Sequence, residues 1–366
     1  DKLALVKATY DERFSTQFPE FANDTKEERT KRYKDYSETA DNVIDTLIKD
    51  HLENFTFQVD PTNELRHIHY PIDLMSIIFN EDEYRTTRFE AYRKLTLMEY
   101  AQDVDHALQQ SEGSIDEVNY FLSQTLLNKD QKRGTQERLY IASTHDQTTL
   151  TCMDHAEFST RQDAEAYRSQ HPGTKLTILP IRRLQDGNRE IFISTREKSC
   201  ESQVIKLSRK GSHEPTESIP DRFGALVVVK TYRDVRRVIE QFIAGAQISG
   251  SEIQVTDIED NILDGKYSAE NTGSSPDFRV CKLQVKLHGL KVELMIHTVE
   301  TFLDSLYKHG VSRAEFEINR VFETGVIEKL FPQQVYDLEN IIVLHKQAIS
   351  RARLKLRMQE NLSLQN

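Results

Sequence analysis

Apolar residues recur every three or four positions through the first third of the chain, a spacing that places side chains on one face of an α-helix. They include Val43, Leu47, Ile48, Leu95, Met98 and Ala101. Another helix is expected after Ser114, because a serine followed three residues later by Glu117 is typical of a helix N-terminus. The pattern predicts a mainly helical domain over residues 1–135.

Strand-like segments replace this pattern after Gly134. Runs of β-branched and other apolar residues predict strands over residues 175–181, 190–194, 225–229, 280–287 and 291–296. Asp186-Gly187-Asn188 joins the first two segments as a hairpin, and His288-Gly289 joins the last two. For residues 136–330 we expect an α+β fold, a mixed, mostly antiparallel sheet flanked by helices. Residues 331–366 are expected to contain a long C-terminal helix.

The composition is that of a charge-rich globular protein, with 37% hydrophobic and 29% charged residues. No apolar run approaches the roughly 20 residues that a membrane helix needs, so we expect no membrane span. The net charge of −11 argues against a general nucleic-acid coat. Cys152, Cys200 and Cys281 lie far apart, which is typical of a reducing compartment, and we expect a cytoplasmic protein.

Cations gather where the predicted strand 190–194 ends. The segment that follows contains Arg196, Lys198, Ser202 and Lys206. Ser202 and Lys206 are four residues apart, which is the spacing of neighbours on one face of a helix. Such a group can bind a polyphosphate, although a solvated basic helix end has the same composition.

Two carboxylates follow later in the sequence. Asp221 stands just before the apolar segment 225–229, and Glu293 interrupts the apolar segment 291–296. On neighbouring strands their oxygens would together bind Mg²⁺. Each also has an ordinary explanation, Asp221 as a turn residue and Glu293 as an outward-facing side chain on a sheet with one wet face.

The order and spacing of these residues resemble the (p)ppGpp synthetase domain of the RelA/SpoT family. The first group matches the family motif R-x-K-x-x-x-S-x-x-x-K. The other matching residues, all before residue 310, are Asp221, Gly224, Glu293, Thr298 and His309, and Phe278 takes the position of the family's nucleobase-stacking tyrosine. The resemblance implies a nucleotidyltransferase-like sheet and a pyrophosphokinase, an enzyme that moves the β,γ-pyrophosphate of ATP to a ribose 3′-hydroxyl.

The resemblance also assigns roles to these residues. The phosphates of ATP are bound by Arg196, Lys198, Ser202 and Lys206. The Mg²⁺ ion is held by Asp221 and Glu293, of which Glu293 also takes the proton from the attacking hydroxyl. The acceptor is bound by Phe278, Lys282 and His309.

Departures from the family pattern gather on the acceptor side. Family residues of other types are replaced by Leu226, Phe278, Lys282, Met295, His297 and Lys308. The polar stretch Asp257–Asp277 reads as an inserted loop. The acceptor therefore stays open between a guanine nucleotide, as in the stringent response, and an adenine nucleotide or a tRNA 3′ end, as for a delivered toxin or effector. A degenerate fold that binds a nucleotide or a partner without catalysis is the alternative.

Three weaker motifs complete the sequence. The predicted C-terminal helix carries Lys346, Arg351, Arg353, Lys355 and Arg357. A basic amphipathic helix either contacts RNA or packs on its own domain with a solvated basic face, and both interpretations stay open. For His145-Asp146 and for His67-x-His69 we expect structural rather than metal-binding roles.

Overall fold

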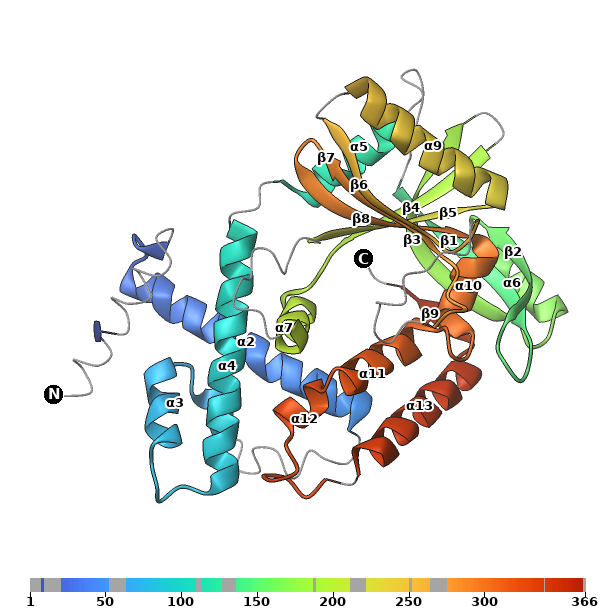
Figure 1. Ribbon diagram of the computed structural model, residues 1–366. Helices are drawn as coiled ribbons and strands as arrows, with labels where there is room; N and C mark the ends of the chain where they lie inside the picture. Colours follow the sequence, from blue (N-terminus) through green and yellow to red (C-terminus); the bar gives the residue numbers. More distant parts are fainter. Residues whose placement is uncertain are drawn as a thin grey trace. The chain divides into compact units, whose positions relative to one another are not determined.

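The computed structural model describes residues 8–9, 21–52, 64–109, 113–126, 136–186, 189–210, 222–249, 252–263, 275–338 and 340–364 (Figure 1). The chain forms two compact units from interleaved segments. Unit 1 comprises Asp1–Gln110, Ser199–Ile219 and Thr324–Ala348, and unit 2 comprises Ser111–Lys198, Pro220–Glu323 and Ile349–Asn366. From the sequence we instead expected three continuous domains, over residues 1–135, 136–330 and 331–366. Whether these three ranges have separate functions stays a prediction.

Unit 1 is helical over most of its described part. Its elements are α2 (Lys26–His51), η3 (Leu65–His67), α3 (Pro71–Ile78), α4 (Arg85–Gln109), α7 (Cys200–Lys210), α12 (Val326–Leu330) and the start of α13 (Ile341–Met358). The positions with helical spacing form its core, since Val43, Leu47 and Leu97 are fully buried. Helix α4 is bound to the last segment of the unit by Arg93, whose Nη1 donates to the carbonyl oxygen of Leu330 at 2.9 Å.

Unit 2 is built on a sheet that has nine strands within the described residues, in the order β2-β1-β3-β4-β5-β8-β7-β6 with β9 beside β3. The strands are β1 (Gln136–His145), β2 (Cys152–Phe158), β3 (Lys175–Asp186), β4 (Arg189–Glu197), β5 (Phe223–Val229), β6 (Ile253–Asp260), β7 (Cys281–Leu287), β8 (Leu290–Thr298) and β9 (Asn361–Ser363). Neighbours are antiparallel except β5–β8 and β3–β9, which are parallel. The mixed, mostly antiparallel α+β fold predicted from the sequence is confirmed.

The two faces of the sheet carry different helices. Helices α5 (Ile115–Leu126) and α9 (Tyr232–Ser249) cover one face, which we call the α9 face, and share a core cluster with β4, β5, β7 and β8 (Figure 1). The opposite face, the α10 face, carries α10 (Val299–Tyr307), whose Phe302 and Tyr307 share a cluster with Phe192 and Val228. Because side chains alternate between the two faces of a strand, residues 192, 194 and 196 of β4 lie on the α10 face.

The hairpin formed by β7 and β8 follows the sequence closely. His288 and Gly289 have φ angles of 49° and 89°, and Leu287 pairs with Leu290 across them. Two successive residues with positive φ match the right-handed twist of the flanking strands, and glycine adopts that conformation without strain. The predicted hairpin is confirmed.

Strand β6 corrects the expectation of an inserted loop over Asp257–Asp277. Residues 257–260 of that stretch belong to β6, which pairs with β7, and residues 264–274 lie outside the described part of the chain. The sequence hides this strand because its register shifts between Val255 and Asp257, which interrupts the alternation of apolar and polar residues.

The long C-terminal helix expected within residues 331–366 is α13, which runs from Ile341 to Met358 and divides between the two units after Ala348. Within unit 2, the guanidinium of Arg353 donates from Nε and Nη2 to one oxygen of Glu315, at 3.0 and 2.8 Å. Glu315 lies on α11 (Arg313–Glu323) and its side chain is only 2% exposed. Part of the basic face of α13 therefore packs on its own unit, and contact with RNA stays a prediction. In the described part of the chain, no helix combines the length and apolar character needed to cross a bilayer.

We expect Arg353→Ala to lower the free energy of unfolding by about 1–3 kcal/mol, because it leaves the buried carboxylate of Glu315 without its charged partner. Arg313→Ala is the matched control on α11, since Arg313 pairs with Glu317 where both side chains are more than half exposed. Exposed pairs of this kind contribute less than about 1 kcal/mol. Denaturant titration of the two variants compares them directly, and equal losses would contradict the assignment.

Candidate functional site

A row of four residues crosses the α10 face of the sheet. Arg196 on β4 pairs with Gly224 on β5, Gly224 pairs with Glu293 on β8, and Glu293 pairs with Gln284 on β7. Paired residues on neighbouring strands project to the same face. Gly224 has no side chain, and a Cβ atom placed there would lie 3.6 Å from Nε of Arg196. The Arg196 side chain therefore extends over the glycine, and we call this arrangement the Glu293 row.

Lys198 joins the Glu293 row one residue beyond the end of β4. Its Nζ lies 3.3 Å from Oε2 of Glu293, and the two side chains are 18% and 21% exposed. Its backbone N–H donates to the carbonyl oxygen of Arg222 at 3.0 Å, which continues the pairing of β4 with β5. Partial burial reduces screening by water, so this ion pair is stronger than one on the open surface. The sequence placed Lys198 and Glu293 in separate roles and did not foresee their contact.

An apolar pair lies beside the Glu293 row. Leu226 on β5 is directly opposite Met295 on β8, and both side chains are partly buried. Met295 is also opposite Lys282 on β7, whose Nζ lies 3.8 Å from Oε2 of Glu259. Two of the departures from the family pattern are therefore cross-strand neighbours, and the predicted acceptor residue Lys282 lies on the other side of Met295.

Phe278 lies next to His297, the second departure from the family pattern on β8. The two ring centroids are 5.9 Å apart, and Nδ1 of His297 is 3.2 Å from Oγ1 of Thr301. His297 is 2% exposed, and this burial lowers its pKa to about 3. A neutral imidazole cannot replace the charge of an arginine, so His297 supports the fold and the Phe278 ring.

Two predicted ATP-binding residues belong to the other unit. Ser202 and Lys206 lie on α7 of unit 1, four residues apart as expected, with Ser202 exposed and Lys206 partly buried. The opposite side of α7 contributes Val204 and Leu207 to the core of unit 1. The four residues of the predicted phosphate-binding motif are thus divided between the units, and their joint action stays a prediction.

His309 occupies a different part of unit 2. Its backbone N–H donates to the carbonyl oxygen of Thr149 at 2.8 Å, in the turn between β1 and β2. Burial lowers its pKa. The structure does not bring His309 into contact with Phe278 or Lys282 through any interaction between described residues, and its acceptor role stays a prediction.

The described residues supply an incomplete set of metal ligands. They contain no group of three or more His, Cys, Asp or Glu residues that would hold a metal ion. Mg²⁺ prefers several oxygen ligands, whereas the carboxylate of Glu293 is paired with an ammonium group. Asp221, the expected second ligand, lies outside the described residues. Glu293 alone does not form a magnesium site, and Mg²⁺ binding stays a prediction that depends on Asp221.

The His145-Asp146 motif has structural partners in this fold. Nδ1 of His145 is 3.0 Å from the carbonyl oxygen of Leu150, and Nε2 is 2.8 Å from Oγ of Ser143. Asp146 accepts hydrogen bonds from the backbone of Thr148 and Thr149, at 3.0 and 2.7 Å. These contacts organise the turn between β1 and β2.

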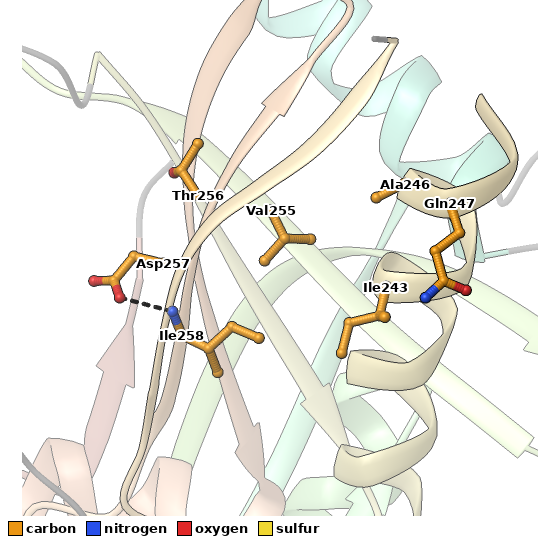
Figure 2. Close-up of a pocket in the computed structure, with 7 residues that line it drawn as sticks. All are labelled: Ile243, Ala246, Gln247, Val255, Thr256, Asp257 and Ile258. Carbon is orange, nitrogen blue, oxygen red and sulfur yellow. Dashed lines mark hydrogen bonds between the residues drawn. The ribbon is translucent and has the colours of Figure 1, made fainter. Parts of the chain in front are cut away.

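A shallow groove of about 580 Å³ lies elsewhere in unit 2, between α9 and the strand β6 (Figure 2). It is lined by Ile243, Ala246, Gln247, Val255, Thr256, Asp257 and Ile258. In Figure 2, Val255 lies between the strand and α9, whereas Asp257 lies on the far side of the strand and accepts a hydrogen bond from the backbone of Ile258. No predicted site residue lines the groove, so the Glu293 row remains the candidate site.

We expect stability to depend on pH through His297. An unfolded histidine has a pKa near 6.5, so between about pH 6.5 and about pH 3 the unfolded chain binds a proton that folded His297 does not. The free energy of unfolding therefore falls as the pH is lowered from about 6.5, by up to about 1.4 kcal/mol per pH unit from this residue. In His297→Gln the dependence between pH 6.5 and 5 should be shallower, as measured by denaturant titration.

The exposed His171 provides the control, because His171→Gln also removes one histidine from the chain. The comparison uses the slope against pH rather than the stability itself, so a general destabilisation by either substitution does not affect it. A wild-type slope in His297→Gln would show that His297 takes up a proton equally in both states.

No protein-family model matches the chain, and no curated protein matches it. Among solved structures, the chain is similar to small alarmone synthetase 1 from Bacillus subtilis, in a structure with its product pppGpp and in a second structure of the same protein. Both alignments have 20% sequence identity and cover 45% of this chain and 76% of the synthetase, with TM-scores of 0.24 and 0.26. TM-scores this low do not establish a shared fold, so a functional assignment depends on the residues and their geometry.

Proposed function

We propose that this protein is a nucleotide pyrophosphokinase, which moves the β,γ-pyrophosphate of ATP to the ribose 3′-hydroxyl of a second nucleotide. The observation that carries the proposal is the Glu293 row with Lys198. Arg196 on β4 and Glu293 on β8 lie on the α10 face on either side of Gly224 on β5, and Lys198, one residue beyond β4, pairs with Glu293. Phosphoryl-type transfer depends mainly on positioning and charge neutralisation, which these side chains can supply.

The reaction gives each of these residues a task. The 3′-oxygen of the acceptor attacks the β-phosphorus of ATP, and its proton passes to the carboxylate of Glu293. The bond between that phosphorus and the oxygen bridging to the α-phosphate breaks, and AMP leaves with the electron pair. Arg196 and Lys198 neutralise the phosphate charge during the transfer. A contribution of Ser202 and Lys206 to ATP binding stays a prediction from the family resemblance.

The ion pair between Lys198 and Glu293 is compatible with this chemistry. Without a nucleotide, the two groups neutralise each other at 3.3 Å. A triphosphate carries more negative charge than one carboxylate, so it competes for the ammonium group of Lys198. Glu293 is then able to accept a proton, and a base of this kind contributes about 10²–10⁴-fold to the rate.

A second function, nucleotide binding without catalysis, is favoured by one observation. Leu226 and Met295 place an apolar pair beside Glu293, where the family resemblance expects arginine and glutamine. Loss of those polar groups removes interactions that would stabilise charge in a transition state. The two functions differ in one measurable respect, because only the enzyme forms a labelled product from ATP.

We expect Glu293→Gln to reduce pyrophosphate transfer by about 10²–10⁴-fold, because the amide cannot accept the proton of the attacking hydroxyl. The measurement incubates the protein with ATP labelled at the γ-phosphate, Mg²⁺ and, separately, GTP, GDP, AMP, ATP and tRNA. The labelled product identifies the acceptor.

Glu300→Gln is the matched control, since Glu300 is an exposed glutamate in the first turn of α10. It should transfer pyrophosphate at the wild-type rate. Near wild-type turnover by Glu293→Gln would rule out Glu293 as the general base. Binding of ATP without any labelled acceptor would favour the second function.

A further inference from the structure

The Leu226–Met295 pair lies between the apolar cluster beneath α10 and a part of the same face that carries several charged side chains. Along β8, Lys291 and Glu293 precede Met295 on the α10 face, and along β7 Lys282 and Lys286 lie on the same face. Leu226 contacts the core cluster beneath α10, so it is held in place from one side. Strand neighbours are about 4.8 Å apart, which makes the pair a continuous apolar surface two strands wide.

The Leu226–Met295 pair lies at a defined distance from Glu293, the candidate general base. Met295 follows Glu293 by two residues on the same face, a separation of about 7 Å along a strand. This is about the distance between the 3′-oxygen of a nucleotide and the middle of its base. A nucleotide whose 3′-hydroxyl approaches Glu293 therefore has its base within reach of Met295 and Leu226.

We infer that Leu226 and Met295 form the surface on which the base of the acceptor nucleotide packs, and that acceptor choice is consequently insensitive to the hydrogen-bonding groups of the base. This inference rests on the proposed pyrophosphokinase function. Leucine carries no donor or acceptor, and the thioether of methionine is polarisable and packs well on aromatic faces. Phe278 adds a second apolar surface beyond the pair, next to the buried ring of His297.

The charges around the pair fit a nucleotide. Lys282 lies beside Met295 on β7, and Arg196 and Lys198 lie near Glu293 at the other end of the surface. An apolar centre with cations on two sides matches a planar base attached to phosphates. A site of this composition selects the class of ligand by stacking and charge, because stacking tolerates every base.

The physical consequence is weak discrimination between bases. A site built to hydrogen-bond one ligand rejects analogues by about 10⁴–10⁵-fold, since its buried polar groups are otherwise left unpaired. An apolar contact discriminates far less. We therefore expect the diphosphates of guanosine, inosine and adenosine to bind at the acceptor site with affinities within about tenfold of one another.

The experiment measures binding rather than turnover. The ATP site is first filled with α,β-methylene-ATP, in which a carbon bridge replaces the oxygen that must leave, so no transfer occurs. GDP, IDP and ADP are then titrated in turn by calorimetry. Met295→Ala should weaken the binding of all three diphosphates by a similar factor, about tenfold. Met295→Leu should retain wild-type affinity, because it keeps an apolar side chain of similar size.

Met153→Ala is the matched control, since Met153 is 72% exposed on β2 at the far edge of the sheet. It should bind all three diphosphates as the wild type does. A preference of more than a hundredfold for one base, or unchanged affinities in Met295→Ala, would overturn the inference and leave the proposed function intact. Absence of binding by every nucleotide, including the ATP analogue, would overturn both.

Discussion

The parallel pairing of β5 with β8 is the contact on which the candidate site depends. It sets Gly224 opposite Glu293 and Leu226 opposite Met295, and the remaining pairs of the two strands follow in register. A shift of one residue would turn Glu293 into the core beneath α9, where a charged carboxylate would be desolvated. Val292, Leu294 and Ile296 on β8 oppose that shift, because all three are buried in that core and would leave it.

Local elements of the fold were largely predictable, whereas contacts between distant strands were not. The β7–β8 hairpin follows from two apolar segments around His288-Gly289, a signal contained in a few consecutive residues. The β5–β8 pair joins residues that are 69 positions apart, such as Gly224 and Glu293, and only the family resemblance indicated it. Strand β6 was missed because its register shift and its acidic residues give it the composition of a loop.

The candidate site shows the same division between local and distant information. The sequence identified Arg196, Lys198 and Glu293 as chemically important residues from their type and spacing. It could not reveal that Lys198 contacts Glu293, because an ion pair across 95 residues depends on the strand order. Nor could it reveal that His297 is buried and neutral, since its burial depends on helix α10 and on Phe278, which pack beside it. The residue types indicate which chemistry is available, and the order of the strands determines which side chains come into contact.

The interleaving of the two units has a consequence for how the protein is made. Arg93 is bound to Leu330 and Tyr336, more than 230 residues further along the chain, so unit 1 lacks these partners until the ribosome has added them. In unit 2, the buried carboxylate of Glu315 likewise has no charged partner until Arg353 has been synthesised. Unit 1 therefore cannot complete its fold before the C-terminal segments have been synthesised, as an N-terminal domain can during vectorial folding. Each unit therefore reaches its full set of contacts only when segments from late in the sequence are present.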